Sequence, residues 1–264
     1  QYVDLVMEQL PEVPRERILA EVQRRNTAPC VAWAAYHIRA IDPDATMIVS
    51  PADHLILREE VFRDAILQGM DFVEELPSLL TLGVKPTRAE TGYGYIQIGD
   101  ESKGTIRSVK TFTEKPNREL AQVFVDSGEF FWNTGIFIWK AGSIIEAIKQ
   151  YLPEVSIRFE ACSDSFGRPG SEQVVQKQLA ACPNISIDVG IMEKATNVYV
   201  LCTDFGWSDV GTWGSLYALS QKDTCENVVL HGRATCYDSH RNIVSTSEKK
   251  LVILDGLQDY IVTD

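Results

Sequence analysis

Apolar, strand-like runs alternate with amphipathic helical patterns along most of this chain. Helical patterns cover residues 1–10, 28–41, 59–75, 141–151 and 171–181. Strand patterns cover residues 46–50, 79–83, 95–98, 106–113, 134–140 and 198–202. Such alternation is typical of α/β proteins, because a helix between two strands carries the chain back across one face of the sheet. We therefore predict a Rossmann-like α/β fold, in which a mixed but mostly parallel sheet has helices on both faces.

The pattern changes near residue 223. Beyond it, short strand-like segments separated by turns follow one another without a helix, at residues 228–230, 234–237, 242–245, 250–254 and 260–263. A spacing of roughly seven to ten residues fits a small β-rich segment that begins a β-solenoid, or β-helix. We therefore predict two domains, residues 1–222 and residues 223–264. Within the first domain, residues 163–171 are expected to form a loop.

The composition argues against some classes of function. The formal net charge of −12 is unsuited to a general nucleic-acid surface, which needs basic patches to meet the phosphate backbone. No apolar run approaches the ~20 residues of a membrane-spanning helix. The six cysteines form no C-x-x-C pair and no histidine lies at metal-site spacing from them, as in a reduced, cytoplasmic protein. We therefore expect a cytoplasmic protein without nucleic-acid or membrane partners.

Two aspartates lie where a strand-like run gives way to a loop. Asp53 follows the apolar run that Pro51 ends, at the carboxyl end of a strand, where α/β sheets bind ligands. Asp209 lies between Gly206 and Gly211, which allow a tight turn and a close approach to a ligand. Brought together by the fold, the two carboxylates would suit Mg²⁺, which binds one or two carboxylates plus substrate phosphates. Taken singly, each is also explained as a helix cap or turn residue.

Seven short segments carry a resemblance to a known family. In order they are Arg-Asn-Thr-Ala-Pro at 25–29, Ser-Pro-Ala-Asp-His at 50–54, Thr-Leu-Gly-Val-Lys-Pro-Thr at 81–87, Glu-Thr-Gly-Tyr-Gly-Tyr-Ile at 90–96, Phe-Thr-Glu-Lys-Pro at 112–116, Trp-Asn-Thr-Gly-Ile-Phe at 132–137 and Phe-Gly-Trp-Ser-Asp-Val-Gly-Thr-Trp at 205–213. Together they resemble the sugar-1-phosphate nucleotidyltransferases, most closely the mannose-1-phosphate guanylyltransferases. One segment would be a weak signal, but seven in family order are specific.

The chain departs from this family at its beginning. The family opens with a strand and a glycine-rich loop that holds the nucleotide phosphates, and this sequence has no such segment. Backbone N–H groups of a loop of that kind bind phosphate oxygens. We therefore expect the first part of the nucleotide-binding half to be missing, and activity is expected of the complete protein.

The resemblance implies nucleotidyl transfer from GTP to mannose 1-phosphate. An oxygen of the sugar phosphate attacks the α-phosphorus of GTP in line, and pyrophosphate leaves. Because that phosphate is already ionised at neutral pH, catalysis depends on positioning and on neutralising charge. The resemblance implies that Asp53 and Asp209 hold Mg²⁺ at the reacting phosphates. His54 either contacts phosphate or bonds a loop carbonyl.

The resemblance also assigns substrate contacts. Lys115 pairs with the sugar phosphate, and Glu114 accepts hydrogen bonds from sugar hydroxyls. This requires Pro116 to break the strand, so that the two neighbouring side chains no longer point to opposite faces. The alternative for an adjacent Glu and Lys is an ordinary solvated pair. The expected catalytic residues are Asp53, Lys115 and Asp209.

Five further residues are expected to contact the substrates. The main chain at Tyr93 and Gly94 would lie against the sugar, and Asn133 would bond a sugar hydroxyl. Asn26 and Thr27 would contact the nucleotide, although helix capping alone explains them equally well. Asp188 and Lys194 are expected to border the sugar pocket.

Three alternatives stay open from the sequence. The first is the same chemistry on another hexose phosphate or nucleotide, because a single hydrogen bond can change specificity. The second is a regulatory relative that binds sugar nucleotide without turnover. The third, a glycosyltransferase, fits least, because such enzymes lack the Glu-Lys-Pro segment that this chain has at residues 114–116. A homo-oligomer, as a dimer, is expected from the resemblance.

Overall fold

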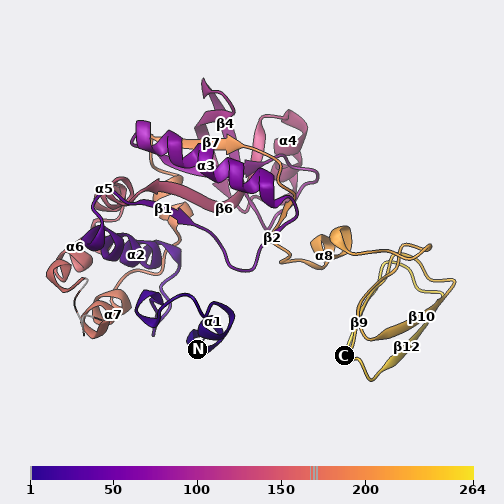
Figure 1. Cartoon of the computed structure of the whole chain (residues 1–264). Coiled ribbons are helices and arrows are strands. Elements are labelled where there is room, and N and C mark those ends of the chain that lie inside the picture. Colours follow the sequence, from indigo (N-terminus) through magenta and orange to yellow (C-terminus); the bar gives the residue numbers. More distant parts are fainter. Residues whose placement is uncertain (1, 167, 169, 171) are drawn as a thin grey trace. The chain divides into compact units, whose positions relative to one another are not determined.

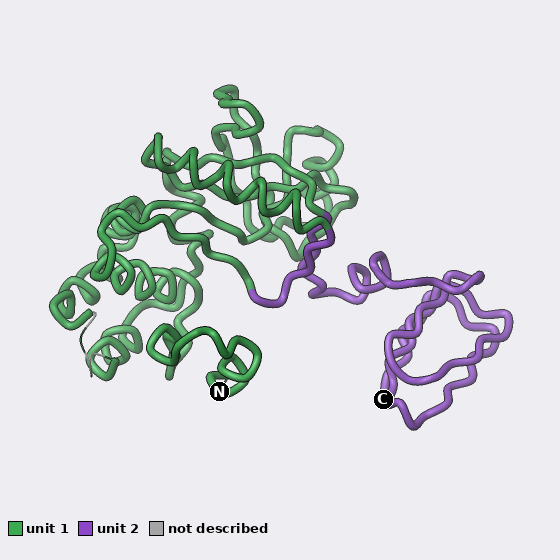
Figure 2. Tube along the Cα trace, in the orientation of Figure 1, with its two compact units in different colours: residues 1–51, 58–205 green, residues 52–57, 206–264 purple. Residues whose placement is uncertain are grey.

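The computed structural model describes residues 2–166, 168, 170 and 172–264. The chain forms two compact units, shown in Figure 2. Unit 1 comprises residues 1–51 and 58–205, and unit 2 comprises residues 52–57 and 206–264. Units defined by contacts are not functional domains, so the boundary expected between residues 222 and 223 stays a prediction.

Unit 1 is built on a six-stranded sheet in the order β1-β6-β3-β7-β5-β4. The strands are β1 (Thr46–Val49), β3 (Leu79–Val84), β4 (Gly94–Lys103), β5 (Ile106–Glu114), β6 (Phe130–Lys140) and β7 (Val198–Cys202). The mixed α/β class predicted from the sequence is confirmed. Strands β1, β3, β4 and β7 run in one direction, but β5 and β6 run against them. As a result, β3 and β7 form the one parallel ladder in the described part of this sheet, where mostly parallel pairing was expected.

A short turn explains part of this difference. β4 and β5 are joined at Gly104, whose φ of +64° suits a tight turn, and a connection this short can join antiparallel strands only. The alternation of elements predicts crossovers between parallel strands, and it does not reveal where a hairpin replaces one.

Helices cover both faces of the sheet, as expected (Figure 1). On one face, α2 (Thr27–Ile41), α5 (Ala141–Tyr151) and α6 (Pro153–Glu160) share a core with Phe137 and Trp139 of β6. On the other face, α3 (Glu59–Glu75) lies so close to β6 that a Cβ at Gly69 would be 2.5 Å from the side chain of Ile138. Successive side chains of β6 therefore pack against helices on opposite faces of the sheet. α4 (Arg118–Ser127) precedes β6.

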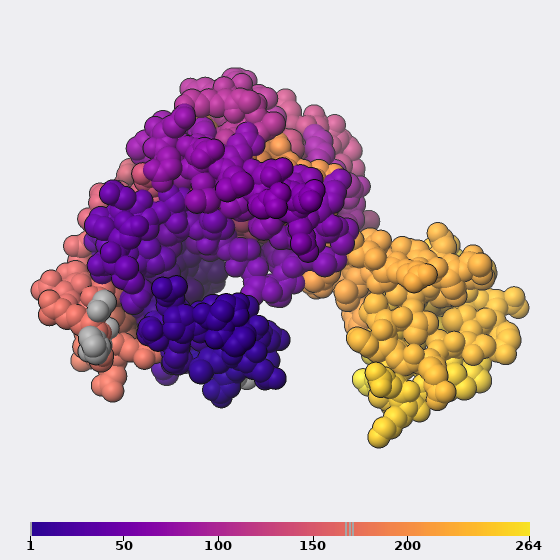
Figure 3. All heavy atoms as spheres, viewed as in Figure 1, coloured from indigo at the N-terminus to yellow at the C-terminus, as the bar shows by residue number. Residues whose placement is uncertain are grey.

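The segment before α2 lies beside α7 (Glu172–Ala180), and Figure 3 shows the N-terminal part (indigo) next to salmon-coloured residues. The predicted helix at 1–10 is α1 (Val3–Gln9), and it buries no side chain. After it comes η1 (Arg15–Arg17). The amide of Val22 then donates to Gln176, and the Arg25 guanidinium donates to the carbonyl of Ala180. Of the loop expected at 163–171, residues 163–165 form the short helix η2 (Ser163–Ser165), and residues 167, 169 and 171 lie outside the described residues.

Unit 2 contains a small parallel β-solenoid, which confirms the predicted β-rich segment. Its strands are β9 (Val228–His231), β10 (Arg233–Tyr237), β11 (Ile243–Ser245), β12 (Leu251–Asp255) and β13 (Ile261–Thr263), and β2 (Leu55–Ile56), β8 (Trp207–Ser208) and α8 (Trp213–Leu219) complete the unit. Val228 pairs with Ile243, and Ile243 pairs with Ile261, so each strand pairs in parallel with the strand one coil later. The coils turn at the stacked residues Glu226, Arg241 and Asp259, which all have positive φ (62°, 54° and 63°). No helix in the described part of the chain is both long and apolar enough to cross a membrane.

Two stacked asparagines hold the solenoid interior. Asn227 and Asn242 are 2% and 0% exposed. The Asn242 amide nitrogen donates to Asn227 Oδ1 (2.9 Å) and to the carbonyl of Leu257 (3.0 Å), and its Oδ1 accepts from the backbone N–H of Tyr260 (2.9 Å). One side chain therefore links its own coil to the coils on either side.

We expect Asn242→Ala to destabilise unit 2 by about 1–3 kcal/mol, because it removes the acceptor of the Tyr260 backbone N–H and one of the two donors to the Leu257 carbonyl. Hydrogen exchange read by mass spectrometry should show faster exchange in peptides from residues 223–264 and unchanged exchange in unit 1. The control is Asn184→Ala, at an exposed asparagine of unit 1. Equal exchange in wild type and Asn242→Ala would contradict this account of the ladder.

Candidate functional site

Glu114 and Lys115 lie together at the end of β5. In a regular strand neighbouring side chains point to opposite faces. Here Lys115 has a φ of +47°, and its amide donates to the carbonyl of Tyr93 (3.2 Å). Its ammonium reaches back to Glu114 Oε1 at 2.8 Å. The two side chains therefore lie on the same side of the strand end, as expected from the break at Pro116. Hydrogen bonding to Glu114 raises the pKa of Lys115.

Gly94 lies between two of the expected site residues. The ladders of β4 place it opposite Glu114 on one side and opposite Asn133 on the other. A Cβ at this position would lie 2.5 Å from Glu114 Oε2 and 3.3 Å from Asn133 Cβ. The absence of a side chain therefore lets the carboxylate of Glu114 lie over the β4 backbone beside Asn133.

The carboxamide of Asn133 has a fixed orientation. Its Oδ1 accepts from the Thr81 hydroxyl (3.1 Å) and from the Gly135 amide (3.2 Å). Its Nδ2 donates to Asp188 Oδ1 (2.9 Å). Thr81 was not among the residues expected at the site. Its polar side chain inside a strand whose six residues are all buried could have indicated a buried hydrogen bond.

Asp188 completes a cluster with Glu114, Lys115 and Asn133. It is the first residue of η3 (Asp188–Met192), a single π-helical turn. Burial, and then the nearby Glu114 carboxylate, raises its pKa to about 6, while Asn133 and Lys115 oppose the rise. The cluster thus combines one ammonium, two carboxylates and one fixed amide. Lys194, which was expected nearby, lies exposed beyond the end of η3.

The start of α2 is joined to the segment before Asp188. Asn26 has a φ of +66°, and its Oδ1 accepts from the Thr27 amide (2.8 Å). The Thr27 hydroxyl oxygen accepts from the Ile187 amide (2.8 Å). Both residues thus have a local structural role, and their contact with a nucleotide stays a prediction.

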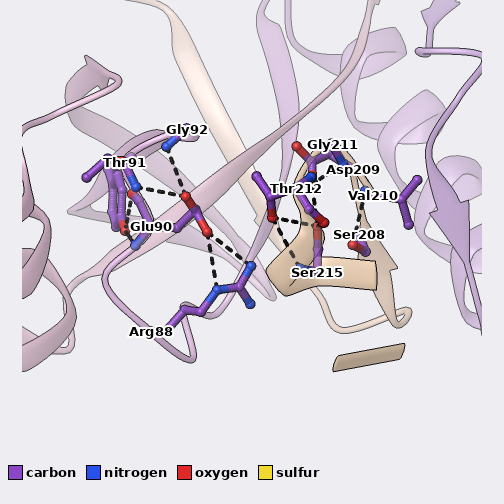
Figure 4. A network of polar contacts seen from close by, with 11 residues as sticks. Arg88, Glu90, Thr91, Gly92, Ser208, Asp209, Val210, Gly211, Thr212 and Ser215 are labelled. Carbon is purple, nitrogen blue, oxygen red and sulfur yellow. Dashed lines mark hydrogen bonds and ion pairs between the residues drawn. The ribbon is translucent and has the colours of Figure 1, made fainter. Parts of the chain in front are cut away.

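The loop that leads to Gly94 is organised by Glu90 (Figure 4). One carboxylate oxygen accepts from the amides of Thr91 (3.0 Å) and Gly92 (3.2 Å), and the other accepts from the Arg88 guanidinium (3.2 Å). Arg88 lies over the ring of Trp132, 5.3 Å from its centroid. The ring of Tyr93 is buried edge-on against the same tryptophan at 5.1 Å. The backbone carbonyl of Tyr93 accepts from the Lys115 amide, and so contacts the cluster directly.

Unit 2 brings Asp53 and Asp209 to the same imidazole. The short β2–β8 ladder pairs Leu55 with Ser208, and so sets residues 53–54 beside residues 207–209. His54 Nδ1 accepts from the Trp207 indole N–H (3.1 Å), which places the proton of the neutral ring on Nε2, 3.9 Å from Asp53 Oδ1. Burial lowers the pKa of His54, and the charges of Asp53 and Asp209 oppose that effect.

A tight turn presents Asp209 (Figure 4). Its Oδ1 accepts from the Gly211 amide (3.2 Å), and Ser208 Oγ accepts from the Val210 amide (3.2 Å). Val210 has a φ of +45°, which is rare for a β-branched residue and costs on the order of 1–3 kcal/mol. Within the described residues, no group of three or more His, Cys, Asp or Glu side chains is arranged to hold a metal. Metal binding by Asp53 and Asp209 stays a prediction.

We expect Asp188→Asn to stabilise the protein at neutral pH and to leave its stability unchanged near pH 4. The raised pKa means that ionised Asp188 opposes folding, so the stability of the wild type falls as the pH rises from about 4 to about 6. The shift of about two pKa units corresponds to about 3 kcal/mol. Urea unfolding of wild type and variant at pH 4, 6 and 8 measures it, with exposed Asp126→Asn as the control. A difference between Asp188→Asn and wild type that is the same at pH 4 and pH 8 would contradict the assignment.

Comparisons with known proteins show which family the chain resembles over its length. The chain is 37% identical to a mannose-1-phosphate guanylyltransferase of Escherichia coli K12 and 36% identical to one of Salmonella muenchen, over 98% of this chain and 55% of each relative. The chain thus spans about half the length of these curated relatives.

Solved structures and a family model give the same picture. A structure described as a mannose-1-phosphate geranyltransferase, from Thermus thermophilus, matches with a TM-score of 0.85 and 30% identity, over 99% of this chain and 74% of that one. A Helicobacter pylori structure described as a mannose-6-phosphate isomerase matches with a TM-score of 0.65 and 26% identity, over 78% of this chain and 80% of that one. The model of the family described as Nucleotidyl transferase matches residues 4–226. The chain belongs to the nucleotidyl transferase family.

Proposed function

We propose that the protein containing this chain transfers the guanylyl group of GTP to α-D-mannose 1-phosphate, giving GDP-mannose and pyrophosphate. The names of its relatives support this substrate pair. The observation that carries the proposal is the cluster at Gly94, where one ammonium lies beside two carboxylates and a fixed amide. A hexose 1-phosphate needs a cation for its phosphate together with acceptors and donors for its hydroxyls.

In the proposed mechanism, Lys115 binds the phosphate of the sugar. Its ammonium is held at Glu114, and a phosphate dianion competes for the same charge. Glu114 then accepts a hydrogen bond from a sugar hydroxyl, and Asn133 donates one. These contacts align an oxygen that is already ionised, so the residues contribute orientation and charge and no proton transfer is needed.

We also propose that Asp53 and Asp209 hold Mg²⁺. Two carboxylates beside one imidazole suit an ion that takes its remaining ligands from water and substrate phosphates. Mg²⁺ bound there supplies positive charge that neutralises the charge developing on the phosphate oxygens. His54 is held by Trp207, and its Nε2 lies 3.9 Å from Asp53 Oδ1. A homodimer in the cytoplasm is part of the same proposal.

The test is pyrophosphate release by the complete protein from GTP, Mg²⁺ and mannose 1-phosphate, with glucose 1-phosphate in parallel. Asp209→Asn should lower kcat by about 100-fold or more, because it removes charge next to the reacting phosphates. The matched control is Asp238→Asn, since Asp238 is an exposed aspartate of unit 2 outside the Asp209 turn. Release that is faster with glucose 1-phosphate, or equal kcat in the two variants, would overturn the proposal.

Gly94→Ala should raise the KM for mannose 1-phosphate at least tenfold. A methyl group at this position displaces the Glu114 carboxylate, which lies 2.5 Å from the place of the added Cβ. The control is Gly142→Ala, where no atom lies within 4 Å of the added Cβ. Steady-state kinetics with the sugar phosphate varied should separate the two, and an unchanged KM in Gly94→Ala would place the sugar elsewhere.

A further inference from the structure

Asp188 joins two of the sequence motifs that lie far apart in the chain. On one side, Ile185 accepts from the Ala28 amide (3.1 Å) and the Ile187 amide donates to Thr27 (2.8 Å). On the other side, Asp188 accepts from Asn133 (2.9 Å). Residues 185–188 therefore connect the start of α2 to the cluster at Gly94.

The backbone that carries Asp188 is firmly held. The carbonyl of Asp188 accepts from the Glu193 amide (2.9 Å), which is the i to i+5 bond of a π-turn. Ile187 and Ile191 are 1% and 0% exposed. A Cβ at Gly190 would lie 2.9 Å from Leu152, so the turn packs closely against the start of α6. Because its backbone is fixed, Asp188 can hold the Asn133 side chain, to which it is hydrogen-bonded, in one orientation.

The charge of Asp188 does not serve the fold. Its ionised form lies near Glu114 and opposes folding, as its raised pKa indicates. An asparagine could accept the same hydrogen bond from Asn133. What the carboxylate adds is strength, because a hydrogen bond to an ionised acceptor is roughly twice as strong as one between neutral groups.

This bond leaves one donor on Asn133. Its Oδ1 is taken by Thr81 and Gly135, and one N–H is taken by Asp188. Among the residues that the structure describes, no acceptor is found for the second N–H. The second N–H of Asn133 is therefore available to a ligand in a direction that Asp188 fixes.

We propose that Asp188 is a positioning residue that sets sugar specificity by holding the Asn133 carboxamide, so that its second N–H donates to one hydroxyl of a hexose 1-phosphate. The inference rests on the proposed function and adds a residue to it. The role differs from catalysis, since Asp188 acts through Asn133. The ligand class is a phosphorylated hexose with an acceptor oxygen at that position.

The test compares steady-state kinetics of the complete protein as wild type, Asp188→Ala and Asp188→Asn. We expect Asp188→Ala to raise the KM for mannose 1-phosphate at least tenfold and to change the KM for GTP less than twofold. Asp188→Asn, which keeps an acceptor, should raise it less. Discrimination against glucose 1-phosphate should fall in the same order. A parallel change in both KM values, or no change, would overturn the proposal.

A double variant separates positioning from structure. Asp188→Asn combined with Asn133→Asp exchanges the two side chains and keeps a hydrogen bond between them, but position 133 then has no N–H to offer. We expect the KM for the sugar phosphate to stay raised, whereas a purely structural pair would recover wild-type KM. Asp126→Asn controls for loss of one charge. If Asp188→Ala does not fold, Asp188→Asn and the double variant carry the test.

Wild-type activity reports on the proposed function separately. If the wild type releases no pyrophosphate but binds a hexose 1-phosphate in calorimetry, the same variants are compared by Kd for that ligand. A tenfold weaker Kd in Asp188→Ala would then support the role of Asp188 while the proposed function fails. A wild type that binds no hexose 1-phosphate would overturn both.

Discussion

The double pairing of β4 at Gly94 is the constraint on which the cluster in unit 1 depends. The same residue lies opposite Glu114 in one ladder and opposite Asn133 in the other. Main-chain hydrogen bonds in two directions therefore set the distance between a carboxylate and an amide that are 19 positions apart in the sequence (114 to 133). Rigid strands hold side chains more accurately than a loop would, and the lack of a Cβ creates the space that these groups share.

The motif loops share a backbone feature. Asn26, Lys115 and Val210, each in a different motif, have φ values of 66°, 47° and 45°. Left-handed backbone in residues other than glycine costs free energy, and the surrounding bonds must supply it. In each case a local hydrogen bond is present: Thr27 donates to Asn26, Lys115 donates to Tyr93 and Val210 donates to Ser208. Side chains are thereby aimed in directions that a regular strand or helix does not offer.

Local chemistry was predictable from the sequence to a useful extent. The α/β class and the β-rich segment followed from periodicity. The shared side of Glu114 and Lys115 followed from the family resemblance, which requires Pro116 to end the strand there. The antiparallel placement of β6 did not, because alternation fixes neither strand order nor direction. The hydrogen bonds that Asn133 makes with Thr81 and Asp188 could not be predicted either, since they span 52 and 55 residues and depend on that order. The bond from Trp207 to His54 has the same origin, in a ladder of two residue pairs.

The stacked corners of the solenoid limit how this part of the molecule can change in length. Positive φ recurs at Glu226, Arg241 and Asp259, and the buried amides of Asn227 and Asn242 follow two of these corners. An insertion of a few residues would take a corner and its asparagine out of alignment with the coils on either side. A whole extra coil would preserve every contact, since each coil interacts with its neighbours alone. The solenoid can therefore change in length by whole coils, but not by a few residues, without loss of its stacked corners.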